Sequence, residues 1–234
     1  MGNKTTNVQP NDLNYGHYSE NKYDRDIVNS IPFHKELHQK IAQYIQKNFK
    51  STQKYEVLDL GVGTGITSKL IQDVLPESHL TVVDFSEQMM KGAKRKLGNK
   101  NVTYLLGDYA SLSLKKNMYD AIVSVVGIHH QTDLGKKKLF NKIYSLLKPG
   151  GVFIFGDLVT YKDQYAKAYN HALHYHHLVE HATDKKTLRE WSHHHMFLNL
   201  LAPVEDQINW LEEVGFKVKT ELLKMNTALL VCKK

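Results

Sequence analysis

The stretch Asp59-Leu60-Gly61-Val62-Gly63-Thr64-Gly65 decides the fold of this chain. It follows the apolar segment Tyr55–Leu60, a predicted strand, and leads into a helical pattern over Thr64–Leu75. A strand that passes through a glycine-rich turn into a helix forms a crevice for a ligand at the edge of a sheet. Glycine suits such a turn because the backbone needs positive φ there and the ligand touches the main chain.

The spacing of the glycines distinguishes this turn from a dinucleotide-binding loop. The pattern is G-x-G-x-G, whereas the dinucleotide fingerprint is G-x-G-x-x-G, with its third glycine one residue later. Asp59 precedes the turn, and its carboxylate would repel a pyrophosphate but attract a cationic amino group. The loop therefore favours a ligand that is cationic and has no phosphate.

Acidic residues also end the next two predicted strands. Asp84 follows the strand His79–Val83, and Asp108 follows the strand Val102–Leu106. A carboxylate after the second strand of such a fold accepts hydrogen bonds from ribose hydroxyls. We expect Asp108, with Tyr109 beside it, to take an adenine amino group at the same sheet edge.

Strands alternate with helices five times along the chain, which predicts an α/β fold with a doubly wound, mostly parallel sheet and helices on both faces. The further elements expected here are a helix at 87–97 capped by Ser86, a strand at 119–126, a helix at 134–147 and a strand at 152–155.

The flanks complete the expected organisation. We predict a flexible arm at residues 1–22 and one domain at 23–234, which opens with a helical pattern over residues 23–50. A helical lid insertion follows strand five at about residues 161–200. Next come a helix that starts near Pro203 and ends at Gly215, and a terminal hairpin of strands 216–222 and 227–231.

Composition narrows the classes of protein. The 234 residues suffice for one domain, and the single cysteine excludes an internal disulfide framework and a cysteine-rich zinc site. No apolar run reaches the roughly 18 residues of a membrane span, and the polar start lacks a signal peptide, so we expect a cytoplasmic protein. The net charge is +7, but the lysines are scattered along predicted helices, so we do not expect nucleic acid as a partner.

Four segments together resemble the successive motifs of class I S-adenosylmethionine-dependent methyltransferases: Asp59–Gly65, Val83–Ser86, Gly107-Asp108 and Leu147–Gly151. The resemblance implies a Rossmann-like, seven-stranded sheet with its last strand antiparallel. It also implies S-adenosyl-L-methionine as cofactor, a molecule with an ammonium, a sulfonium and no phosphate. The residues that we expect to bind it are Tyr23, His34, Asp59, Gly61, Gly63, Asp84, Phe85, Asp108, Tyr109 and Val125.

The flanking segments Tyr23–Asp26, Ser30–Pro32 and Pro203–Phe216 resemble a subfamily that includes the carboxy-S-adenosylmethionine synthase of tRNA modification. Two positions depart from that enzyme. His34 stands where it has a cofactor-binding tyrosine, and Ser192 stands where an arginine binds the extra carboxylate, with Arg189 three positions away. We therefore expect ordinary methyl transfer.

The chain has 14 histidines, and His129 and His130 follow the fourth predicted strand at the ligand-binding edge of the sheet. His129 is a candidate general base for an acceptor that must lose a proton, because the pKa of imidazole lies near neutrality. Alternatively, it only packs against the methionine part of the cofactor.

Histidines also recur through the predicted lid, at 171, 174, 177 and 181 and in the triplet 193–195. Three roles are open for these histidines: they line an acceptor pocket, they hold a metal ion, or they form a polar surface of the lid. No H-E-x-x-H signature is present in the sequence, and we assign no metal ligand. The tyrosines at 161, 165 and 169 indicate core packing or a substrate cage. The acceptor-side residues that we select are His129, His174, His177 and His194.

The function that these residues predict is methyl transfer to a small-molecule acceptor by in-line displacement, in a monomer or a homodimer. One alternative is a tRNA-modifying methyltransferase or a carboxy-S-adenosylmethionine synthase-like enzyme. Another is a regulator that binds the cofactor without catalysis.

Overall fold

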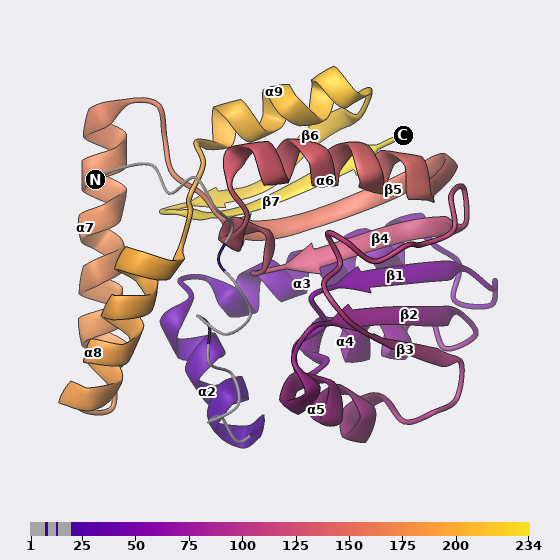
Figure 1. Cartoon of the computed structure of the whole chain (residues 1–234), viewed down its shortest axis with the longest axis horizontal. Helices are drawn as coiled ribbons and strands as arrows, with labels where there is room; N and C mark the ends of the chain where they lie inside the picture. Colours follow the sequence, from indigo (N-terminus) through magenta and orange to yellow (C-terminus); the bar gives the residue numbers. More distant parts are fainter. Residues whose placement is uncertain (1–7, 9–12, 14–19) are drawn as a thin grey trace.

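A single seven-stranded sheet forms the centre of the computed structural model, which describes Val8, Leu13 and residues 20–234 (Figure 1). The strand order is β3-β2-β1-β4-β5-β7-β6, and β7 alone runs antiparallel to its neighbours. The expected Rossmann-like arrangement is confirmed. The strands are β1 Glu56–Leu60, β2 His79–Asp84, β3 Val102–Leu106, β4 Tyr119–Val125, β5 Leu147–Leu158, β6 Lys217–Lys224 and β7 Thr227–Lys233.

The helices follow the predicted order with one difference. The helical pattern over residues 23–50 is two helices, because Pro32 disfavours helical backbone before it and Phe33 adopts a left-handed φ of 58°. The expected arm at residues 1–22 falls mostly outside the described residues, although Val8 and Leu13 are described and buried. The helices are α2 Glu20–Ser30, α3 His34–Asn48, α4 Ile66–Val74, α5 Glu87–Leu97, η2 Ile128–His130, α6 Asp133–Leu146, α7 Gln164–His181, α8 Lys185–His193, η3 His194–Leu198 and α9 Val204–Val214.

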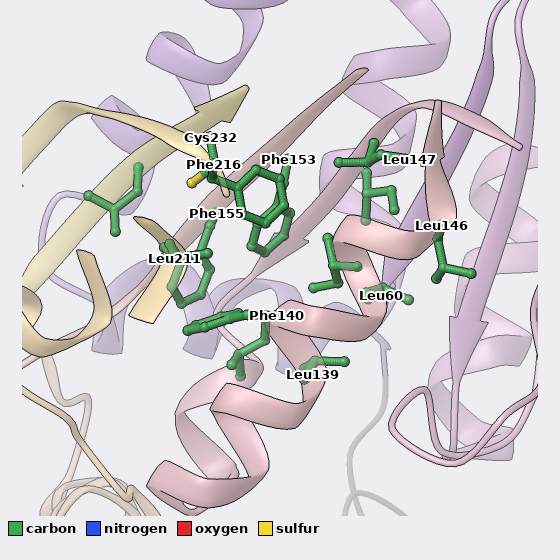
Figure 2. Packing of buried hydrophobic residues seen from close by; sticks show 14 of the residues in the cluster. Leu60, Leu139, Phe140, Leu146, Leu147, Phe153, Phe155, Leu211, Phe216 and Cys232 are labelled. Atoms are coloured by element: carbon green, nitrogen blue, oxygen red, sulfur yellow. The ribbon is translucent and has the colours of Figure 1, made fainter. Parts of the chain in front are cut away.

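Helices cover both faces of the sheet, and each face buries its own hydrophobic cluster. On one face, α6 and α9 cover an aromatic core in which Phe153 and Phe155 stack 5.4 Å apart and Phe140 meets Phe155 edge-on at 5.6 Å (Figure 2). On the other face, α3, α4 and α5 contribute Leu37, Ile71 and other apolar side chains. The central strands are apolar on both sides because both sides are covered.

The helices α7, α8 and η3 form an insertion between β5 and α9. The arrowheads of β1, β2 and β4 point toward α2, and α7 and α8 stand beyond it (Figure 1). Helix α2 packs against α7, so the N-terminal helix and the insertion approach one another off the carboxyl edge of the sheet. No helix among the described residues is long and apolar enough to span a membrane.

Candidate active site

The glycine loop between β1 and α4 has the backbone that its sequence requires. Gly61 and Gly63 have φ values of 81° and 55°, in the left-handed region that favours glycine. Asp59 lies buried at the end of β1, where the Ser68 hydroxyl donates a 2.7 Å hydrogen bond to its Oδ2. Burial raises the pKa of Asp59 to about 7 despite that bond. A cation near the loop would therefore be favourable, because it would stabilise the ionised form.

The Asp84 side chain, at the end of β2, holds the glycine loop by hydrogen bonds. Its Oδ2 accepts a 2.8 Å hydrogen bond from the Gly63 amide, and its Oδ1 accepts one of 2.8 Å from the Ser86 amide. Burial raises the pKa of Asp84 to about 6, while these amides oppose the rise. Asp108 is exposed at the end of β3, and the neighbouring Tyr109 hydroxyl donates to the Gly127 carbonyl at 3.1 Å.

A first cavity lies against this loop. Its volume is about 140 Å³. Asp59 does not line it and lies beneath the loop instead. The other predicted cofactor residues do line it: Tyr23, His34, Gly61, Gly63, Asp84, Phe85, Asp108, Tyr109 and Val125.

A second cavity, of about 630 Å³, adjoins the first and reaches toward the helical insertion. The predicted acceptor-side residues His129, His174 and His194 line it. His177 does not; its Nε2 lies 2.8 Å from the Asn29 carbonyl of α2. The residues that line both cavities are Leu13, Tyr23, Ile27, Val126 and His130.

The partner of His129 is a buried carboxylate that the sequence patterns did not single out. Asp157 Oδ1 lies 2.5 Å from His129 Nδ1, and its Oδ2 accepts a 2.8 Å hydrogen bond from the His129 amide. Both residues are almost fully buried. Asp157 stands near the end of β5, so the rule that located Asp84 and Asp108 after their strands would also have found it.

Part of the chain is similar to known methyltransferases. Residues 57–151 match a family model described as a methyltransferase domain. Malonyl-acyl-carrier protein O-methyltransferase 2 of Ilyobacter polytropus is 36% identical over 106 residues, which span 45% of this chain and 40% of that protein. Demethylmenaquinone methyltransferase of Leptospira interrogans is 32% identical over 152 residues, or 62% of this chain and 59% of that protein. The chain spans about half the length of the curated relatives it matches.

A solved structure agrees in fold. A putative S-adenosyl-L-methionine-dependent methyltransferase of Methanococcus maripaludis covers 91% of both chains with a TM-score of 0.59 at 19% identity. Residues 57–151 are thus similar to a methyltransferase domain, and the fold of the chain agrees with that similarity. The match supports the methyltransferase resemblance found in the motifs, and S-adenosylmethionine is the cofactor that this resemblance implies.

The lining of the first cavity fits that cofactor chemically. The carboxylates of Asp84 and Asp108 are acceptors for ribose hydroxyls and for an amino group. The buried Asp59 carboxylate beneath the loop complements a cationic amino group. A Cβ on Gly63 would lie 3.7 Å from the Tyr23 ring, in van der Waals contact, so α2 borders the cavity closely at the loop.

Burial keeps three histidines of the second cavity neutral. It lowers the pKa of His174 and of His194 to about 4 and that of His195 to about 2, and neighbouring imidazoles add to the effect in all three. At pH 7 these three residues thus offer neutral imidazoles, which accept protons or bind metal ions.

The tyrosines of the insertion differ from one another. Tyr161 packs against the hydrophobic cluster, as core packing predicts. Tyr165 and Tyr169 stack with ring centroids 6.2 Å apart, and they are 78% and 54% exposed. The expectation of core packing is wrong for these two residues, which line neither cavity, whereas a substrate cage stays a prediction.

Proposed function

We propose that this chain transfers a methyl group from S-adenosylmethionine to a small-molecule acceptor held in the second cavity. The observation that carries the proposal is the junction of the two cavities, where Tyr23, Val126 and His130 belong to both walls. A cofactor in the first cavity and an acceptor in the second would meet at this junction. The acceptor does not follow from the relatives, because the chain spans only part of each of them.

The bound cofactor supplies a methyl group already activated by its sulfonium. The chain's own residues would align the acceptor and exclude water, which is a proximity effect. Tyr23 from α2 and Val126 after β4 would close the junction over the reacting atoms. Val126 holds a left-handed φ of 55°, a strained conformation for a β-branched residue, which supports a functional role for this turn.

The His129–Asp157 pair is our candidate for activating the acceptor. Asp157 lies where it can accept the Nδ1 proton of His129, and in the neutral tautomer with that proton the lone pair is on Nε2. As a free imidazole, His129 would take the proton of an acceptor O–H, N–H or S–H at Nε2 while the acceptor bonds to the methyl carbon. His174 and His194 would line the acceptor beside it.

The test compares turnover with cofactor affinity in His129→Ala and Asp157→Asn. We expect kcat to fall by roughly 10²–10⁴-fold in His129→Ala, the usual contribution of a general base, with the cofactor Kd within about threefold of wild type. Product is measured by mass spectrometry over a panel of small O, N and S nucleophiles, and cofactor binding by calorimetry. His176→Ala, on the exposed face of α7, is the control.

Wild-type turnover in His129→Ala would remove that residue from the chemistry. Tight cofactor binding with no methylated product from any acceptor would instead favour the regulator that binds the cofactor without catalysis.

The carboxy-S-adenosylmethionine alternative retains one supporting observation, since Arg189 lines the second cavity together with Glu190. The mass of the cofactor that copurifies with the chain tests it. Ordinary methyl transfer predicts S-adenosylmethionine or its demethylated product, without the added mass of a carboxyl group.

A further inference from the structure

Three imidazoles converge at one end of the second cavity. The ring nitrogens of His129, His130 and His194 include a set that lies within 4.8 Å of one another. Two of these residues belong to η2 after β4, and the third begins η3 after α8. The ring centroid of His130 lies 4.1 Å from that of His129 and 5.3 Å from that of His194.

In two of the three residues, Nδ1 already contacts an oxygen atom. His129 Nδ1 faces Asp157 Oδ1, and His130 Nδ1 lies 3.0 Å from the Leu198 carbonyl. Each of these contacts places a proton on Nδ1 and leaves the Nε2 lone pair free. Metal-binding histidines in proteins are held in this way, by a carboxylate or a backbone carbonyl on the second nitrogen.

We propose that His129, His130 and His194 bind a divalent transition-metal ion such as Zn²⁺, with the remaining coordination position open to the second cavity. Imidazole suits zinc and its neighbours in the transition series, and three protein ligands with one open position are typical of catalytic zinc sites. Nitrogens about 2.1 Å from a tetrahedral zinc lie about 3.4 Å apart, so small rotations of the three rings would close the site.

The charges around the cluster are compatible with a cation. The buried Asp157 carboxylate lies directly behind His129 and offsets positive charge at the site. The ammonium of Lys136, on α6, is directed to the carbonyls of Gln131 and Leu200, at 2.5 and 2.6 Å. Asp157 is thus a positioning residue for the ion, which it would influence through His129.

This inference rests on the proposed function and assigns a class of acceptor to the second cavity. His130 belongs to both cavity walls, so an ion held by it would lie beside the junction. Its open position would bind an acceptor through an oxygen, nitrogen or sulfur lone pair. With the ion bound, His129 is a ligand, and the ion takes over the activation of the acceptor.

The test uses the full chain, freed of any affinity tag and stripped with a chelator. Zn²⁺ binding is measured by calorimetry, and Co²⁺ is added as a spectroscopic reporter of imidazole coordination. We expect one equivalent of Zn²⁺ per chain, binding at least about tenfold weaker in His194→Ala and in His194→Asn, and binding roughly 10–100-fold weaker in Asp157→Asn. His176→Ala should match the wild type.

Cofactor affinity in the first cavity checks that each variant is folded, because His194 does not line that cavity. Less than about 0.1 equivalent of bound Zn²⁺ in the wild type, or equal affinities in the wild type and both His194 variants, would overturn the metal site. Methyl transfer by the stripped chain would then leave the proposed function standing. Metal binding without any cofactor binding would overturn the proposed function alone.

Discussion

Asp84 connects the backbone of the glycine loop to the expected ribose site. Its two oxygens accept hydrogen bonds from the amides of Gly63 and Ser86, and a carboxylate has about four acceptor sites in all, enough to bind a ligand hydroxyl as well. We predict that Asp84→Ala raises the dissociation constant of S-adenosylmethionine more than about tenfold, or about 1.4 kcal/mol. Isothermal titration calorimetry measures the change.

The matched control is Asp73→Ala, since Asp73 is an exposed carboxylate on α4 that pairs only with Lys69 in the described contacts. It should leave the affinity unchanged. Equal cofactor affinity in the wild type and Asp84→Ala would contradict the ribose role of Asp84.

Single residues of the cofactor site were predictable, whereas those of the acceptor site were less so. The aspartates at the carboxyl ends of β1, β2 and β3 come together because parallel strands bring these ends to one edge of the sheet. His177 was selected by its spacing in a helix, but spacing does not specify which side of α7 faces α2. Its contact with Asn29 depends on tertiary packing that joins residues 148 positions apart.

At the scale of elements, the lack of a side chain on Gly65 lets the start of α4 pack closely against α5. Its φ is 88°, and a Cβ on it would lie 3.3 Å from Ala93 Cα and 3.4 Å from Leu97 Cγ. Gly150 also has a positive φ, 78°, but a Cβ there meets no atom within 4 Å. Both glycine-to-alanine changes incur left-handed strain of about 1–2 kcal/mol, and only Gly65→Ala adds crowding.

We therefore predict that Gly65→Ala lowers the free energy of unfolding by at least about 1 kcal/mol more than Gly150→Ala. Urea denaturation monitored by circular dichroism measures both, with Gly150→Ala as the control. Equal losses would show that α5 moves aside freely and that the contact is unimportant.

The elements themselves were largely predictable from local signals. Ser86 and Gly98 bound α5 at the expected residues, with the Ser86 hydroxyl accepting the Met89 amide. The fifth strand is longer than expected, because the Lys148–Gly151 segment, with its Pro-Gly pair, indicates a turn, whereas the structure pairs Leu147 with Tyr119 across a register shift. Pairing with a neighbouring strand overrides that local preference.

At the scale of the whole molecule, buried histidines predict acid sensitivity. Burial lowers the pKa of His34 to about 3, of His174 and His194 to about 4 and of His195 to about 2. Below about pH 6.5 the unfolded chain binds protons that the folded chain does not, so stability falls as the pH falls. The raised pKa values of Asp59 and Asp84 act in the opposite direction, but they are fewer.

We predict that the free energy of unfolding falls by several kcal/mol between about pH 7 and pH 5. Each histidine whose pKa is lower in the folded chain than in the unfolded chain costs about 1.4 kcal/mol per pH unit between its two pKa values. Urea denaturation at the two pH values measures the loss. His195→Asn should reduce the loss relative to the wild type, and the exposed His176→Asn should not. An unchanged pH dependence in His195→Asn would contradict the prediction.

The wall that Tyr23, Val126 and His130 share between the two cavities has a thermodynamic consequence. If a ligand in one cavity fixes these side chains, it changes the free energy that the other ligand needs to fix them. The coupling between the two sites is then reciprocal. If the bound cofactor raises the affinity for the acceptor by some factor, the bound acceptor raises the affinity for the cofactor by the same factor. The order in which the two ligands bind would change the path of assembly but not this factor.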